Sequence, residues 1–323
     1  MSSDAVPLRT ADPVRLAQIV EVVETVFHGK QEVVRFAVAA LVARGHVLFE
    51  DIPGVGKTTL ARALAAIVGL GFRRIQFTSD MLPSDVLGAS VFNPKTAGFE
   101  VRPGPIFTNI VVADEINRAP PRTQSGLLEA MQEGRVTIDE RSYELPRPFI
   151  VMATQNPLEH HGTYPLPESQ LDRFLMRLTI GYPNESAERR ILLESVGGDD
   201  PIDGIDPLLN PGELLALQAM VEDVHVDPSL VDYLMNIVRA TRTDPRVRMG
   251  VSPRGAIGLF RAARAFALVS GRRYLVPDDI RQLVTPCLAH RLVPIGSAVA
   301  SAEAHEAGAI VLDEIVSSVP VPV

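Results

Sequence analysis

The sequence predicts an α/β fold in which a parallel sheet covered by helices is followed by a smaller, all-helical domain. In the first part of the chain, short apolar runs alternate with segments whose apolar residues recur at spacings of three and four. Strands that alternate with helices are typical of a parallel sheet with helices on both faces. Beyond residue 183 the strand patterns stop and helical patterns dominate. We therefore expect a first domain over residues 1–183 and a helical domain over residues 184–323.

The expected elements can be placed along the chain in order. Helical spacing of apolar residues predicts one or two helices over residues 13–43. Short apolar runs between turn residues predict strands at 46–49, 74–77, 110–113, 149–154 and 174–180. Further helices are expected at 60–68, 124–132, 186–195, 211–221, 229–241, 253–270 and 277–289.

Two segments of the first domain are expected to form hairpins outside the sheet. Residues 82–105 carry repeated Pro and Gly around short apolar stretches, which is typical of turns between short strands. Residues 134–147 hold two short strand patterns that turn at residues 139–141. Both hairpins would interrupt the route between strands of the main sheet.

Composition limits the class of protein. The chain has 323 residues, 31 Lys+Arg against 39 Asp+Glu, a formal charge of −8 and one cysteine, Cys287. A single cysteine excludes an internal disulfide scaffold and suits a reducing cytoplasm. The negative charge disfavours nucleic acid as a partner. Neither a signal peptide nor an apolar run of the ~20 residues that a membrane span needs is visible, so a cytoplasmic location is expected.

A Gly-rich stretch follows the first expected strand and leads into a helix, which is the context that a P-loop requires. Its glycines let backbone N–H groups turn toward phosphate oxygens. Lys57 is expected to reach the β- and γ-phosphates, and the Thr58 hydroxyl to ligate Mg²⁺. Asp51 replaces the first glycine of the general pattern, but it stands at the entry of the loop and leaves the anion site open. The residues expected to bind nucleotide are Pro53, Gly54, Val55, Gly56, Lys57, Thr58 and Thr59.

Two carboxylates follow the expected strand at 110–113, and an amide follows the strand at 149–154. The carboxyl ends of such strands meet at the ligand crevice of an α/β sheet. Asp114 is expected to hold Mg²⁺ through water, and Glu115 to orient or deprotonate the attacking water. Asn156 can hydrogen-bond both a γ-phosphate oxygen and that water. These motifs predict ATP hydrolysis with ATP and Mg²⁺.

The sequence of these motifs closely resembles that of MoxR-type AAA+ ATPases, and the resemblance runs from about residue 13 to the C-terminus. The resemblance rests on Asp-Ile-Pro-Gly-Val-Gly-Lys-Thr-Thr at 51–59, Ala-Asp-Glu-Ile-Asn-Arg-Ala-Pro-Pro at 113–121, Leu-Leu-Glu-Ala-Met-Gln-Glu-Gly at 127–134, Thr-Gln-Asn-Pro at 154–157 and Gly-Thr-Tyr-Pro-Leu-Pro-Glu at 162–168. It implies a P-loop AAA+ core with a five-stranded parallel sheet and a helical lid. It also implies a homo-oligomeric ring, commonly a hexamer, and a chaperone-like role in remodelling or maturing a protein client. A von Willebrand factor A domain protein is an expected partner.

Ring assembly gives a role to two arginines. The resemblance implies that Arg173 is an arginine finger that reaches the neighbouring subunit's γ-phosphate, and that Arg254 is the second sensor arginine. Both could instead be surface arginines in salt bridges. Arg118 and Arg122 are weaker candidates for contacts between subunits, or they only support the interface.

Three readings of the whole chain remain open from the sequence. The favoured one is an ATP-hydrolysing ring protein that remodels a protein client. The alternatives are an ATP-dependent nucleic-acid motor or loader, and a nucleotide-gated binding module with negligible hydrolysis. The low aromatic content of 5% disfavours a single-strand binder, which usually needs stacking rings. The adjacent His160 and His161 give little support to a metal site, because neighbouring residues of a strand face opposite ways.

Overall fold

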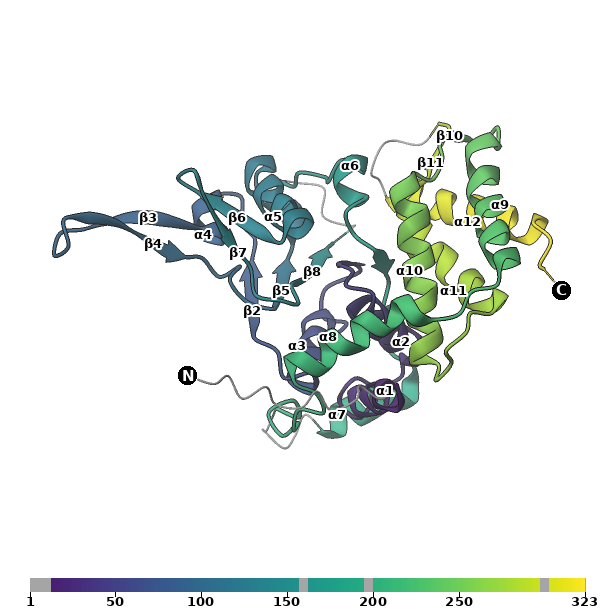
Figure 1. Ribbon diagram of the computed structural model, residues 1–323, viewed down its shortest axis with the longest axis horizontal. Coiled ribbons are helices and arrows are strands. Elements are labelled where there is room, and N and C mark those ends of the chain that lie inside the picture. The colour runs from purple at the N-terminus through teal and green to yellow at the C-terminus, as the bar shows by residue number, and fades with distance from the viewer. Residues whose placement is uncertain (1–12, 157–161, 195–199, 297–301, 323) are drawn as a thin grey trace.

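The computed structural model describes residues 13–156, 162–194, 200–296 and 302–322 (Figure 1). Within them, the main sheet has five strands in the order β2-β5-β8-β1-β9. All four neighbouring pairs are parallel. The strands are β1 (Val47–Glu50), β2 (Phe72–Gln76), β5 (Ile110–Asp114), β8 (Ile150–Gln155) and β9 (Met176–Leu178). The parallel α/β sheet that the sequence predicts is therefore confirmed.

The three central strands are almost entirely buried, because helices cover both faces of the sheet. Every residue of β1 and β5 is buried, as are five of the six residues of β8. Such continuous apolar runs are typical of a parallel sheet that has no solvent-facing side. The carboxyl ends of β1, β5 and β8 lie side by side and lead into the P-loop, into Glu115 and into Asn156. The motifs singled out in the sequence therefore share one edge of the sheet.

Helices of the first part of the chain pack around this sheet. They are α1 (Val14–Val26), α2 (Gln31–Val42), α3 (Lys57–Ile67), α4 (Pro83–Leu87), the 3-10 turn Ile116–Arg118, α5 (Pro121–Glu133) and α6 (Glu168–Leu171). The one or two helices expected at 13–43 are two, joined by a turn that contains Gly29. Helix α3 begins at Lys57, three residues before the expected start, because the turn of the P-loop ends directly in the first helical residue.

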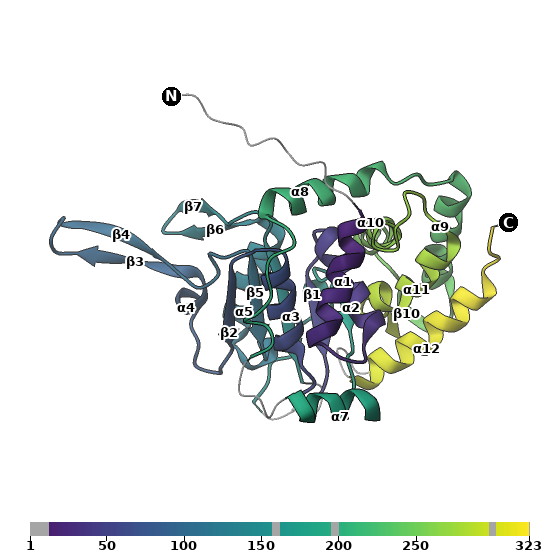
Figure 2. The ribbon, with the colours of Figure 1, turned by 90° about the horizontal axis from the view of Figure 1, so that it is seen from below.

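Two antiparallel hairpins leave the sheet within the segments expected to hold them. One is β3 (Gly88–Asn93) with β4 (Gly98–Pro103), and the other is β6 (Arg135–Ile138) with β7 (Arg141–Glu144). Figure 1 shows both on the side of the molecule away from helices α9 to α12, and Figure 2 shows β3 and β4 extending well beyond the sheet. They add no strand to the main sheet and are open to other molecules.

The C-terminal part is helical, as predicted. Its helices are α7 (Glu185–Glu194), α8 (Pro211–Met220), α9 (Pro228–Thr243), α10 (Pro253–Val269), α11 (Pro277–Leu288) and α12 (Ala302–Ser318), with a small sheet of β10 (Val247–Met249) and β11 (Val293–Pro294). The sequence predicts neither α12 nor β10–β11. Helix α10 packs against α2, and the buried side chain of Gln218 donates to the carbonyl of Leu41. One apolar cluster thus includes residues from both parts of the chain, and a boundary at residue 184 stays a prediction.

Three further sequence observations concern particular segments. Within the described ranges, no helix combines the length and the apolar character that crossing a membrane requires. His160 and His161 lie outside the described residues. Cys287 is buried in α11, and burial raises the pKa of its thiol to about 12. It therefore behaves as an apolar packing residue.

Candidate active site

The P-loop connects β1 to α3 with two glycines in the left-handed region. Gly54 has φ +84° and Gly56 has φ +91°, a conformation that side-chain-bearing residues avoid. Gly56 also lies so close to Phe27 that an added Cβ would be 2.9 Å from the ring. The Lys57 ammonium donates to the carbonyls of Asp51 at 2.6 Å and Ile52 at 3.1 Å. Burial lowers the pKa of Lys57, and the nearby carboxylates of Asp51, Asp114 and Glu115 oppose this shift.

The buried carboxylate of Asp51 fixes the entry of the loop. One of its oxygens accepts from the backbone N–H groups of Ile180 and Gly181, both at 2.6 Å, and the other accepts from Ile52 at 2.8 Å. The side chain therefore ties the P-loop to the segment after β9. This explains why an acid stands where the general motif has glycine.

Asp114 ends β5 beside the first turn of α3. Its Oδ2 accepts from the Thr58 hydroxyl at 3.3 Å and from Arg74 Nε at 2.5 Å, and its Oδ1 accepts from the Thr154 hydroxyl at 3.2 Å. A hydroxyl and a carboxylate at this separation form a set of hard oxygen donors, which is the type that Mg²⁺ prefers. The two predicted metal ligands, Thr58 and Asp114, are thus brought together.

Glu115 follows Asp114 in the left-handed conformation, with φ +56°. Its Oε2 accepts from Gln76 Nε2 at 2.9 Å and forms an ion pair with Arg118 Nε at 3.0 Å. Its backbone N–H donates to the Thr154 hydroxyl at 3.0 Å. Left-handed backbone at a non-glycine residue costs roughly 1 kcal/mol and is common at functional sites. The structure therefore places Arg118 against the carboxylate of its own chain, whereas Arg122 is exposed at the start of α5.

Asn156 lies directly after β8, which is the strand between β5 and β1. Asn156 is 8% exposed. The side chain thus comes from the same sheet edge as Glu115 and the P-loop. Thr154, two residues earlier, holds both Asp114 and the backbone of Glu115, so the strand that carries Asn156 also positions the carboxylate pair.

A cavity of about 650 Å³ lies beside the P-loop. It is lined by the loop glycines, by Phe27 and His28 after α1, by Ile180 and Gly181 after β9, and by Ile191 of α7. A mixed apolar and polar cavity next to a phosphate loop has the size and character of a site for a base and ribose. Sequence reasoning identified the P-loop residues of this lining but missed the others, because no local motif marks them. The one usable signal was the Phe-His-Gly turn between two helices.

Arg173 and Arg254 lie in a different cavity, of about 530 Å³. Arg173 follows α6, and one of its guanidinium nitrogens donates to the carbonyl of Leu128 at 2.5 Å. Arg254 is exposed in the first turn of α10. Among the described residues, no lining residue is common to this cavity and the cavity beside the P-loop. The two arginines thus line one cavity together, and His46 places that cavity at the amino end of β1, whereas Lys57 follows the carboxyl end of this strand.

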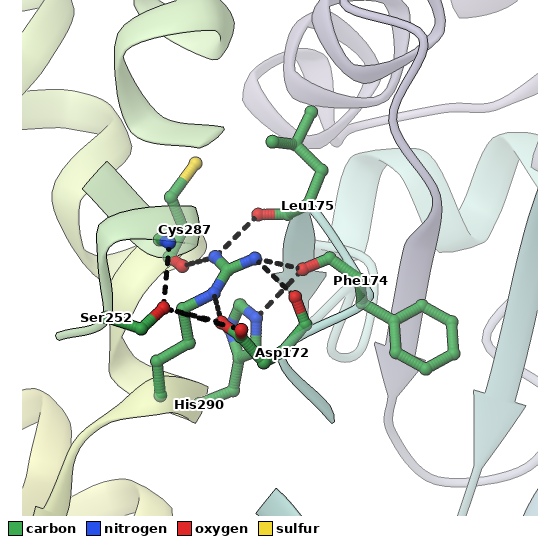
Figure 3. Close-up of polar contacts among 8 residues, drawn as sticks. Asp172, Phe174, Leu175, Ser252, Cys287 and His290 are labelled. Carbon is green, nitrogen blue, oxygen red and sulfur yellow. Dashed lines mark hydrogen bonds and ion pairs between the residues drawn. The ribbon is translucent and has the colours of Figure 1, made fainter. Parts of the chain in front are cut away.

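A buried arginine fixes the turn that carries Arg173, and Ser252 links that turn to the start of α10, which carries Arg254 (Figure 3). Arg291 is 6% exposed, and its guanidinium pairs with the Asp172 carboxylate at 2.7 Å. It also donates to the carbonyls of Asp172, Phe174, Leu175 and Cys287. Ser252 caps α10 by accepting from Gly255 N at 3.0 Å, and the same hydroxyl contacts the Asp172 carboxylate at 3.3 Å. The turn at Arg173 and the start of α10 are therefore fixed to one another.

Comparison with known proteins agrees with this arrangement. A model of the ATPase family associated with various cellular activities (AAA) matches residues 46–176, and an AAA lid domain model matches residues 239–314. The chain is 51% identical over 308 residues to the uncharacterized protein YeaC of Bacillus subtilis, covering 95% of each. It is 40% identical to Chaperone MoxR1 of Mycobacterium tuberculosis, over 93% of this chain and 80% of that protein. The chain belongs to the MoxR-type AAA+ ATPases.

A solved structure supports the fold of this MoxR-type protein along its whole length. The structure, of a candidate ATPase from Cytophaga hutchinsonii, has a TM-score of 0.85 and 33% identity, over 96% of this chain and 97% of the other. The resemblance inferred from the motifs is thus confirmed, as is the AAA+ fold with a helical C-terminal region.

Proposed function

We propose that this MoxR-type protein hydrolyses ATP in a site shared between two copies of the chain. The observation that carries the proposal is the separation of the two cavities. The P-loop, Asp114, Glu115 and Asn156 share one sheet edge, whereas Arg173 and Arg254 lie in the other cavity. If the arginines act on phosphate, they act on nucleotide held by another copy. Head-to-tail contacts of this kind close into rings, and we propose a hexamer.

Each residue of the P-loop side has a chemical role in this proposal. Backbone N–H groups of the loop and Lys57 bind the phosphates, and Thr58 and Asp114 hold Mg²⁺. The metal neutralises charge on the phosphate oxygens when bound. Glu115 orients the attacking water and accepts its proton, and Asn156 holds that water against the γ-phosphate. For this step the Glu115 carboxylate must release Gln76 and Arg118, which it contacts in the structure, and accept a hydrogen bond from the water instead.

The arginine side supplies cationic donors as charge develops on the transferred phosphoryl group. Planar guanidinium groups suit this task because they form paired hydrogen bonds with phosphate oxygens. In GTPases an arginine finger contributes about 10³ to 10⁵ in rate. We propose that both Arg173 and Arg254 act on the neighbouring copy's ATP, because α10 and the turn at Arg173 form one unit.

Mixing of two inactive variants tests the shared site. Arg173→Ala keeps its P-loop but lacks the finger, and Lys57→Ala keeps the finger but cannot bind ATP. Each variant alone should lose at least 100-fold of the ATPase rate, given the contribution of such groups. A mixture should regain activity, because the finger of one variant faces the nucleotide of the other. Assembly is checked by light scattering, and intact assembly without rescue would refute action between copies.

We further propose that ATP turnover drives remodelling of a protein client. A relative is named as a chaperone, and the β3–β4 hairpin presents apolar side chains suited to contact a client. Phe92 is 51% exposed and Phe99 74% exposed, and their rings contact each other across the hairpin with centroids 5.5 Å apart. Exposed aromatic pairs of this kind are uncommon unless they bind something. A von Willebrand factor A domain protein is the partner proposed first.

Capture of bound proteins tests the client role. Glu115→Gln should bind ATP without turning it over and so hold its partners, which affinity isolation and mass spectrometry identify. Adding Phe99→Ala to that variant should remove the client while ATP binding by calorimetry stays unchanged, since the hairpin lies outside the nucleotide site. The matched control is Tyr274→Ala, which removes an exposed ring from the opposite part of the molecule. Identical captured proteins from all three variants would contradict the role of the hairpin.

The nucleic-acid alternative receives little support from the basic residues of the helical part. Arg246 pairs with Asp244 and Glu314, Arg248 pairs with Glu168, and Arg242 donates to the carbonyl of Val251. Arginines whose charge is already paired within the chain contribute little to a surface that binds the phosphates of a nucleic acid. Stimulation of hydrolysis by DNA would nevertheless favour that alternative. The cytoplasmic location expected from the sequence stays a prediction.

A further inference from the structure

The cavity that holds Arg173 and Arg254 contains three more arginines, of which Arg291 is paired with Asp172. Arg44, after α2, and Arg261, on α10, also line it. Among the described residues, none of the other four guanidinium groups forms an ion pair with a carboxylate. Asp172 is the one acid on the described lining, and Arg291 and Ser252 engage it. Four cations that share one cavity without a facing carboxylate of their own create a positive potential that attracts an anion.

Arg44 occupies a backbone position that favours glycine. It has φ +53°, and the helix α2 ends there with Gly45 N donating to the carbonyl of Ala40 at 2.8 Å. Helices that end in this way usually carry glycine at the left-handed residue. The following Gly45 is required by packing, because an added Cβ would lie 2.1 Å from Leu175. The chain thus keeps an arginine where its side chain is exposed toward the cavity and its backbone is strained.

Arg261 belongs to the face of α10 that begins with Arg254. The two arginines and Ile257 are spaced by three and four residues, so they share one side of the helix. Ile257 is 66% exposed between them. Burial and, second, the charge of Arg44 lower the pKa of Arg261, which places the two cations near each other. An exposed apolar residue flanked by unpaired cations is typical of a surface that a charged partner covers.

We propose that Arg44 and Arg261 are further phosphate-contacting residues of the shared site and bind the polyphosphate chain of ATP held by a neighbouring copy. The inference rests on the proposed function. A triphosphate brings several negative charges on one short chain, which matches four guanidinium groups around one cavity. A single carboxylate from a neighbour would compensate one of them. Bidentate hydrogen bonds to phosphate explain why arginine rather than lysine stands at all four positions.

Two substitutions test this role without disturbing the fold. Arg44→Gly removes the guanidinium and places glycine at its preferred backbone conformation, so the melting temperature should stay equal or rise. Arg261→Gln keeps a long polar side chain on the face of α10 that lines the cavity. Each should lower kcat/KM for ATP by about tenfold or more, which corresponds to one lost charge-assisted contact. Mixing either variant with Lys57→Ala should restore part of the loss. The matched control is Arg281→Gln on α11, which should change kcat/KM less than twofold.

The outcomes separate this inference from the proposed function. If wild-type protein fails to hydrolyse ATP, both are overturned. If wild type is active but Arg44→Gly and Arg261→Gln stay within twofold of it, only the inference is overturned. If light scattering shows that both variants weaken assembly equally with and without ATP, the cavity binds acidic side chains of the neighbour and the phosphate role is wrong. Loss of activity with assembly intact supports the inference.

Discussion

At the scale of single residues, His46 shows how one ring fixes the start of the central strand. The backbone N–H of Val151 donates to its Nδ1 at 3.0 Å, so the proton lies on Nε2 and is donated to the carbonyl of Met131 at 3.0 Å. The neutral ring therefore joins β1 to β8 and α5. Burial, with a smaller contribution from the charge of Arg261, lowers the pKa of His46 to about 4.

This pKa predicts a loss of stability in mild acid. Because the folded pKa of about 4 lies below the ordinary value of 6.5, the unfolded chain binds more protons between these pH values. The free energy of unfolding should therefore fall as the pH drops from 6.5 to 4, by up to about 3 kcal/mol. Denaturant unfolding at several pH values measures this. His46→Gln keeps a donor and an acceptor without titrating, so its curve should fall less steeply; parallel curves would assign the acid loss to other groups.

At the scale of elements, the junction between β9, α10 and α11 depends on Arg291. Its guanidinium has five acceptors. Four lie in the segment before β9, namely the carboxylate and carbonyl of Asp172 and the carbonyls of Phe174 and Leu175, and the fifth is the carbonyl of Cys287 near the end of α11. A lysine there could satisfy only some of them, and the rest would be buried without a donor. Arg291→Lys should thus lower the free energy of unfolding by about 3 kcal/mol. The control is Arg246→Lys in an exposed ion-pair network, expected to change it by less than about 1 kcal/mol. Equal effects in denaturant unfolding would contradict the role of the junction.

The elements also show which features the sequence can and cannot predict. The P-loop and the carboxylate pair were predictable because each motif is a continuous stretch at the end of an apolar strand. Helix α12 was not, since its small residues give a weak apolar pattern and its place depends on packing against β11 and α11, which are distant from it in the local pattern. The cavity beside the P-loop and the cavity that holds Arg173 and Arg254 are each lined by segments far apart in the chain. No local spacing in the sequence reveals such neighbours.

At the scale of the whole molecule, the helical part and the sheet share one apolar cluster. Figure 2 shows α1 and α2 between the sheet and the C-terminal helices, while the hairpins extend away from both. The proposed nucleotide site therefore borders this shared core, and the proposed client surface lies on the β3–β4 hairpin that extends away from it.

The junction at Arg291 has a consequence for the proposed ring. Since Asp172 is held by Ser252 and Arg291, the turn at Arg173 cannot shift without the start of α10. In a head-to-tail ring, Arg173 and Arg254 of each copy would then contact the nucleotide of one neighbour. The nucleotide of that copy would be contacted by the arginines of its other neighbour. Information about hydrolysis would pass around the ring in a single direction, and the sequence of firing would have a handedness set by the fold of one chain.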